Sequence, residues 1–251
     1  MTADLGVLFF NELLKLRRSL ATLMLLLAPL SVVLLVVLLH LSNPGGPTED
    51  RWLRLAQTAV AVWAYLVFPL LVALQAAVIN GLEHRVDGWK RMFALPIHPG
   101  RFFLAKLMAL MVMMAFASFL LAVSFYAVTA AAHVGLASWP AIPDGGFTFL
   151  VRSMLACVAG GLFVMVIHHT LSWTLPSFVF PLGIGIVAVM AVFMVGSSKY
   201  WVFLPWCWSL LATAGSDPAI GDAAMMLGAT LALIAAPMAA RGARRLRRLG
   251  Q

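Results

Sequence analysis

The amino-acid sequence predicts an all-α integral membrane protein with six transmembrane helices, an N-terminal interfacial helix and a re-entrant hairpin before the last span. The first observation is composition, because 63% of the 251 residues are hydrophobic and only 10% are charged, whereas a soluble domain is about 25% charged. The second is a series of six long apolar runs, and the third is an uneven distribution of basic residues. This composition excludes a soluble globular domain and an intrinsically disordered chain.

Six apolar runs are each long enough to cross a bilayer. A hydrocarbon core of about 30 Å requires about 20 residues of helix. The helical form is required because lipid offers no hydrogen-bond partners to the backbone. The first run is longer than a signal-peptide core, so we expect it to remain as a span. The predicted spans cover residues 20–41, 56–79, 107–130, 153–173, 174–195 and 223–240.

Residues 1–19 predict a helix that lies in the membrane interface before the first span. Glu12 and Lys15 fall off an apolar stripe with helical spacing, which is formed by Leu5, Leu8, Phe9, Leu13 and Leu16. Two interpretations remain open for this segment. It either anchors the chain through its basic residues alone, or it also contacts a partner protein.

The basic residues predict that both termini are cytoplasmic. With an internal N-terminus, the inner segments 1–19, 80–106, 168–176 and 241–251 contain 13 of the 17 Lys and Arg residues. Such an excess marks the cytoplasmic side of a membrane protein. The net charge of +8 is therefore a signal of topology, and no nucleic-acid partner is expected. The four basic residues on the outer side are Arg51, Arg54, Arg152 and Lys199.

The segment 197–218 predicts a re-entrant element on the outer side. Its apolar stretch 201–214 is interrupted by Pro205 and is too short for a span. If it did cross the membrane, the arginine-rich C-terminus would lie outside, against the charge rule. We also expect four outer tryptophans to lie in the headgroup region, namely Trp139, Trp201, Trp206 and Trp208.

A short amphipathic helix is predicted over residues 82–95, between the second and third spans. Its apolar face consists of Leu82, Val86, Trp89 and Phe93, and its charged face of Glu83, Asp87, Lys90 and Arg91. Pro96 should end this helix at Leu95. The helix either lies on lipid headgroups or docks a cytoplasmic partner, and its mixed charges favour docking.

The chain resembles ABC-2 type permeases, and the resemblance covers most of its length. It is carried by the six-span pattern, the broken hairpin before the last span, and the residues Glu83, Arg85, Trp89, Lys90, Leu95, Pro96 and Lys106. Within that family, the size and loop are similar to lantibiotic-immunity and bacitracin-resistance permeases. The resemblance implies a single transmembrane domain over residues 1–251, in a bacterial cytoplasmic (inner) membrane.

The resemblance also implies partners and site residues. The partners are two cytoplasmic ATPase subunits and a second permease copy or paralogue, all working in contact with membrane lipid. ATPase coupling would fall to Glu83, Arg85, Asp87, Trp89, Lys90 and Arg91, with secondary contacts from Glu12, Lys15 and Arg17. The implied activity is export of a hydrophobic or amphipathic substrate, either a peptide antibiotic or a lipid.

The sequence contains no ATPase site of its own. No G-x-x-x-x-G-K-[ST] motif is present, so we expect no cofactor on this chain, with ATP and Mg²⁺ bound by the partner. The chain is therefore not predicted to be an enzyme.

Two other classes of function fit the sequence less well. An intramembrane metal enzyme is disfavoured because His168 and His169 are adjacent and point about 100° apart on a helix, so no metal site is expected. An ion-coupled secondary transporter is disfavoured because the nine acidic residues fall in loops or at span ends. His168 remains a candidate pathway residue, because ionisable groups inside membranes are usually functional.

Overall fold

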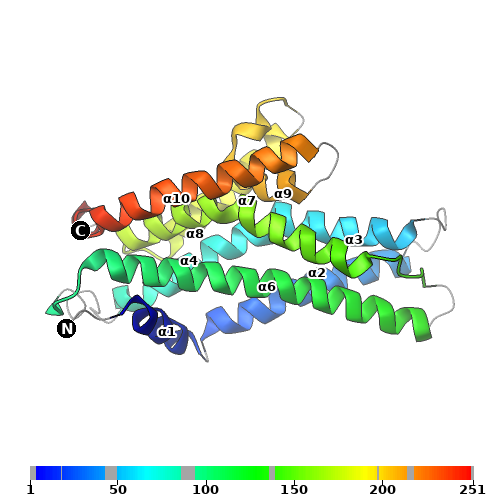
Figure 1. The fold of residues 1–251 in the computed structure, drawn as a ribbon, viewed down its shortest axis with the longest axis horizontal. Coiled ribbons are helices and arrows are strands. Elements are labelled where there is room, and N and C mark those ends of the chain that lie inside the picture. The colour runs from blue at the N-terminus through cyan, green and yellow to red at the C-terminus, as the bar shows by residue number, and fades with distance from the viewer. Residues whose placement is uncertain are drawn as a thin grey trace.

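The computed structural model describes residues 4–17, 19–42, 50–85, 94–135, 139–196, 198–213 and 218–249. Within these ranges the backbone forms helices and turns, with no strand. The long helices run side by side in an elongated bundle, and α1 (Leu5–Leu16) and the C-terminal end of α10 (Pro218–Leu249) lie at the same end of it (Figure 1). The predicted all-α class is confirmed.

Within the described residues, five helical stretches are long and apolar enough to span a membrane. They are α2 (Leu20–Ser42), the stretch Arg51–His84, α6 (Pro99–Gly135), α7 (Gly146–Thr174) and the part Pro218–Ala243 of α10. The sixth predicted span, α8 (Val179–Val195), is apolar but has only 17 residues. At 1.5 Å per residue it reaches about 25 Å.

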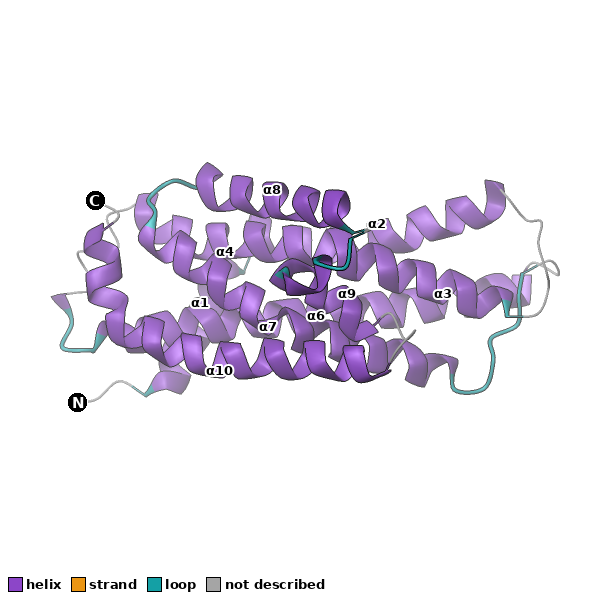
Figure 2. Ribbon diagram, turned by 90° about the horizontal axis from the view of Figure 1, so that it is seen from above, coloured by secondary structure: helices purple, strands orange, loops and turns teal. Residues whose placement is uncertain are grey.

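The late start of α8 has a local cause. The prediction began this span at residue 174, but Leu175 is extended, with φ −92° and ψ 128°. Leu175 precedes Pro176, and the proline ring disfavours helical geometry in the residue before it. The chain therefore bends before α8 begins at Val179. α8 then runs along the edge of the bundle beside α4 (Phe68–Arg85; Figure 2).

The second span contains a π-helical turn. α3 (Arg51–Val62) passes directly into η1 (Trp63–Val67) and then into α4. Pro69 has no N–H to offer the carbonyl of Tyr65, so the α-helical pattern cannot continue there. The Phe68 N–H instead bonds to the Trp63 carbonyl five residues earlier. Pro69 thus widens one turn while the helix continues.

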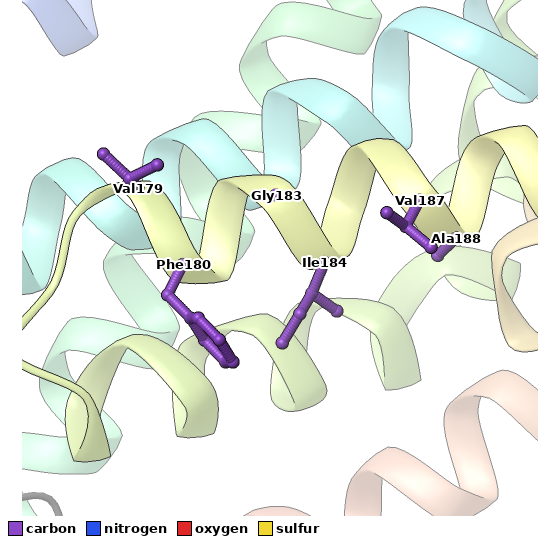
Figure 3. Close-up of a pocket in the computed structure, with 6 residues that line it drawn as sticks. All are labelled: Val179, Phe180, Gly183, Ile184, Val187 and Ala188. Carbon is purple, nitrogen blue, oxygen red and sulfur yellow. The ribbon is translucent and has the colours of Figure 1, made fainter.

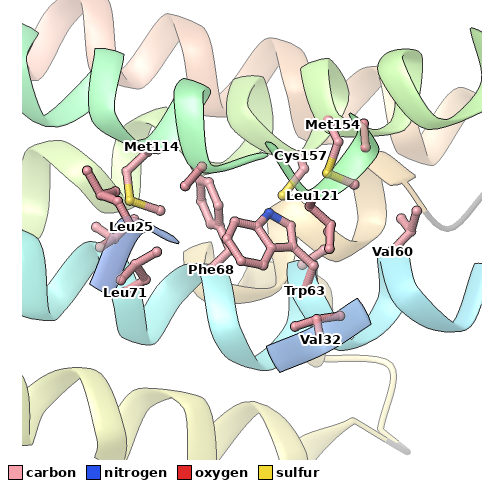
Figure 4. Packing of buried hydrophobic residues seen from close by; sticks show 14 of the residues in the cluster. Leu25, Val32, Val60, Trp63, Phe68, Leu71, Met114, Leu121, Met154 and Cys157 are labelled. Carbon is pink, nitrogen blue, oxygen red and sulfur yellow. The ribbon is translucent and has the colours of Figure 1, made fainter. Parts of the chain in front are cut away.

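The core of the bundle is built around the same turn. Trp63 and Phe68 are fully buried and lie at the centre of the apolar cluster, beside Leu121 and Cys157 (Figure 4). The Trp63 indole N–H donates to Ser118 Oγ over 3.1 Å. The buried indole is therefore paired, as a polar group in lipid surroundings must be.

The segment predicted as re-entrant forms three short helical pieces. They are η2 (Trp201–Phe203), η3 (Pro205–Cys207) and α9 (Trp208–Thr213), and none is long enough to cross a bilayer. They pack against α7 and α10. A Cβ at Gly160 of α7 would lie 2.5 Å from the Trp208 carbonyl oxygen, so only glycine permits this approach.

Two of the four tryptophans predicted for the headgroup region are buried within the protein. Trp139 and Trp208 have only 4% and 6% of their surface exposed. The Trp208 indole donates to the Val202 carbonyl over 2.8 Å. Packing between helices, which composition does not reveal, encloses these two rings.

Candidate functional site

Four charged side chains meet at the cytoplasmic end predicted for the bundle. Lys106 Nζ of α6 donates to Glu12 Oε2 of α1 over 2.6 Å and to Glu83 Oε1 of α4 over 3.3 Å. Lys15 Nζ donates to Glu12 Oε1 and to Glu83 Oε1, each over 2.8 Å. Glu12, Lys15, Glu83 and Lys106 thus form a closed, electrically neutral ion-pair ring that joins α1, α4 and α6.

The ring is largely shielded from solvent. Lys106 is fully buried, and Glu12 and Glu83 are 5% and 7% exposed. A buried ion costs several kcal/mol unless it is paired, so each carboxylate must keep its lysine partners. Burial lowers the pKa of Lys15, but the hydrogen bonds and charges of Glu12 and Glu83 outweigh it and raise the pKa above its usual 10.5.

α1 buries one of its charged residues. The sequence left open whether Glu12 and Lys15 also contact a partner, and Glu12 is buried against α6. Leu16 of the predicted apolar stripe is buried as well, whereas Val7, Phe10 and Leu14 are exposed. The pairing with Lys106 is the physical reason that Glu12 is buried, because it provides the ammonium group with a counter-ion. The third secondary contact, Arg17, is exposed at the end of the helix.

The predicted helix over 82–95 is only partly within the described residues. α4 continues without a break through Arg85, so Glu83 belongs to the long second helix and points into the ring. The chain is described again from Ala94, which is helical, and it bends over 95–97, as Pro96 predicts. Asp87, Trp89, Lys90 and Arg91 lie outside the described residues, as does the side chain of Arg85.

A second polar layer joins α4, α6 and α7 next to the ring. The Asn80 amide lies 3.2 Å from His169 Nδ1 and donates to Ser172 Oγ over 3.0 Å. His169 Nε2 lies 3.1 Å from the Phe103 carbonyl, which can only accept, so Nε2 carries the proton and Nδ1 accepts from Asn80. Sequence analysis missed this layer, although the His168–His169 pair indicated a polar position there.

The C-terminal part of α10 contacts the same region. The Trp173 indole of α7 donates to the Ala243 carbonyl over 3.0 Å. A Cβ at Gly100 of α6 would lie 2.5 Å from the Ala240 carbonyl oxygen, so α6 and α10 approach each other at backbone distance. Four of the long helices therefore meet at this end through polar bonds or direct backbone contact.

His168 points away from this layer. Its Nε2 accepts a hydrogen bond of 3.0 Å from the Trp206 indole of η3, so the proton of the neutral ring is on Nδ1. The side chain is completely buried beside Gly185 of α8. It joins α7 to the outer hairpin. A role in a substrate pathway stays a prediction.

The ring and the second layer lie in a region that matches a known family. Residues 8–192 match the family described as ABC-2 family transporter protein. The chain belongs to the ABC-2 transporter family. This ABC-2 match extends from α1 into α8 and includes all four ring residues. None of the curated proteins or solved structures compared with the chain gave a match.

The ABC-2 chain carries apolar grooves on its flanks. One, of about 500 Å³, lies on α8 and is lined by Val179, Phe180, Gly183, Ile184, Val187 and Ala188. Phe180 and Ile184 project from the same side of the helix, one turn apart (Figure 3). A second groove, of about 320 Å³, lies between α7 and α10 near Phe163 and Ala239. Both suit hydrocarbon, whether lipid or substrate.

Proposed function

We propose that this ABC-2 chain is the permease subunit of an ATP-driven exporter in the cytoplasmic membrane of a bacterium. The observation that carries the proposal is the ion-pair ring. Glu83 lies in the last turn of α4, Lys106 lies in the first turns of α6, and the segment 86–98 connects these two helices in the chain. The ring therefore joins the two ends of the segment that the resemblance assigns to contact with the ATPase.

The contacts of the ring explain how movement of the ATPase would be transmitted to the transmembrane helices. A force on the loop acts on Glu83 and Lys106 first, and their contacts pass it to α1 through Glu12 and Lys15. Buried charges resist separation, because an unpaired one costs several kcal/mol. The three helices should therefore move as one unit when the loop moves.

The partners in this proposal are two cytoplasmic ATPase subunits, which bind ATP and Mg²⁺, and a second permease copy or paralogue. Both termini are assigned to the cytoplasm, in agreement with the shared end of α1 and α10 (Figure 1). The substrate is assigned as hydrophobic or amphipathic, either a peptide antibiotic or a lipid. The apolar grooves on α8 and between α7 and α10 support that choice.

The docking step is tested by charge reversal within the loop. In the Asp87→Lys, Lys90→Glu double variant, the ATPase should no longer co-purify and ATP-dependent transport in proteoliposomes should fall to background. Lys199→Glu, on the opposite side of the membrane, is the matched control and should bind the ATPase normally. Full co-purification together with full transport by the double variant would overturn the proposal.

The substrate is tested separately with two cargoes. Cells that lack the gene are challenged with cationic antimicrobial peptides, and proteoliposomes are loaded with a fluorescent phospholipid. Loss of peptide protection or of ATP-dependent lipid movement identifies the cargo. If both are unchanged, the assignment of a hydrophobic or amphipathic substrate is wrong.

A further inference from the structure

The C-terminal part of α10 carries a cluster of basic residues directly after its apolar span. The apolar stretch extends to Ala243, and the helix continues to Leu249. No polar linker separates the two parts. Five arginines fall between positions 241 and 248, and the side chains of two of them, Arg241 and Arg245, are exposed.

The exposed arginines continue a stripe that faces lipid. Residues four and three positions apart share one face of a helix, and this spacing joins Ile234, Met238, Arg241 and Arg245. Ile234 and Met238 are 54% and 63% exposed, as expected for side chains in hydrocarbon. The opposite face is buried against the protein and consists of Ala232, Ala236, Ala240 and Ala243.

Contacts on the buried face of α10 fix the position of these arginines along the bundle. Ala240 meets Gly100 at backbone distance, and the Ala243 carbonyl accepts from the Trp173 indole. This part of α10 is therefore held against α6 and α7. Arg241 and Arg245 lie on the exposed side of the helix, where the apolar stretch ends at Ala243.

We propose that this basic face of α10 is a binding site for anionic phospholipid headgroups. Arginine matches phosphate with paired hydrogen bonds as well as with charge. Basic clusters on the cytoplasmic side of a span attract anionic lipid. The arginines share their face with lipid-exposed Ile234 and Met238, so a lipid is the neighbour that the geometry favours over a cytoplasmic protein.

The ion-pair ring strengthens this assignment. Glu12 and Glu83 are already engaged by Lys15 and Lys106. These two carboxylates are therefore committed to their own lysines and are not the counter-charge of the arginines of α10, a role that the proposal gives to the phosphate of a lipid. The proposal depends on α10 spanning the membrane, and it does not depend on export.

The test measures lipid binding to the purified full-length permease, without ATPase or ATP. The protein is placed in phosphatidylcholine nanodiscs, and fluorescent phosphatidylglycerol is titrated in. Wild type should enrich phosphatidylglycerol over an equally labelled phosphatidylcholine. Each Arg→Gln change should weaken this preference roughly fivefold, and Arg241→Gln with Arg245→Gln roughly 30-fold.

Three further variants or measurements complete the design. Lys199→Gln removes an exposed basic residue from the other side and should leave the preference unchanged. Arg241→Lys with Arg245→Lys keeps the charge and should bind more like wild type than like the glutamine variant. Gel filtration and thermal unfolding confirm that the variants fold, as expected for exposed side chains.

One result would overturn the proposal, namely an equal preference for phosphatidylglycerol in wild type and in the double glutamine variant. If a separate co-purification assay then showed that this variant had lost the ATPase, the arginines would be assigned to a protein contact. Because the lipid measurement needs no transport, its failure is distinct from failure of the export proposal.

Discussion

Replacing Lys106 with methionine should sharply destabilise the permease, and a second change at Glu12 should reverse most of that loss. Lys106 is fully buried and contacts both carboxylates of the ring. Without it, Glu12 and Glu83 share only Lys15, which leaves one net negative charge in a buried site. Breaking a buried pair in this way costs about 3–5 kcal/mol, or roughly 10 °C in Tm for a chain of this size.

The compensating change follows from charge balance. In the Lys106→Met, Glu12→Gln double variant, Lys15 and Glu83 remain as a neutral pair at 2.8 Å. We expect it to recover at least half of the lost stability. The four proteins of this cycle are compared by thermal unfolding in detergent, followed through the fluorescence of the eight tryptophans. Lys199→Met is the control for loss of an exposed lysine and should shift stability by about 0.5 kcal/mol or less.

The outcome that refutes this reasoning is additivity. If the double variant loses the sum of the two single losses, within about 0.5 kcal/mol, then Glu12 and Lys106 are not coupled. The ring would then not be the element that ties α1 to α4 and α6. The same variants also separate stability from transport. The double variant should recover stability and still transport less, because the contact between Glu12 and Lys106 that joins α1 to α6 is lost.

Three further predictions concern packing, the outer hairpin and pH. Gly160→Ala should cost about 1–3 kcal/mol, because its Cβ meets the Trp208 carbonyl at 2.5 Å. Gly183→Ala, with nothing within 4 Å of its Cβ, should be neutral in the same unfolding assay. Trp206→Phe removes the indole that donates to His168 and should lower the free energy of unfolding by about 1–3 kcal/mol, measured by thermal unfolding. Wild-type stability of this variant would contradict the prediction. The folded-state pKa of Lys15 lies above its usual 10.5, so its stabilisation is complete at neutral pH and lost as pH rises past that raised value. Lys15→Gln should therefore unfold with less dependence on alkaline pH, and an unchanged pH profile would contradict this.

Much of the fold was predictable because lipid imposes simple rules on a sequence. The runs 20–41, 107–130 and 153–173 lie within α2, α6 and α7, since hydrophobic length alone defines a span. Pro96 acts at the position expected of it, because proline restricts the residue before it. The same effect of Pro176 on Leu175 falls inside the run that was predicted as the fifth span. The π-helical turn at Trp63–Val67 was not predictable, since a proline within a span is compatible with several local geometries.

The site was predictable in its members and not in its arrangement. Glu12, Lys15 and Glu83 emerged from the sequence as separate contacts with a partner, and Lys106 only as part of the pattern that carries the family resemblance. Their sequence separations of up to 94 residues conceal the contacts between them. The relevant physical signal is that a lysine inside an apolar helix requires a buried counter-ion. Applied to Lys106, that rule would have called for a buried acidic partner, because its ammonium group lies within an otherwise apolar run.

The arrangement of polar contacts suggests which helix is free to move. α1, α4 and α6 are joined by the ring, α7 by Asn80 and His169, and α10 by the bond from Trp173 to Ala243. α8 is attached at other points, by a hydrogen bond between His168 of α7 and the backbone of Pro181, and by close packing at Gly185, where a Cβ would lie 2.6 Å from Ala73 Cβ. It is also preceded by the bend at Leu175. A displacement of the loop would carry the joined helices together, so α8 is the helix against which they would slide.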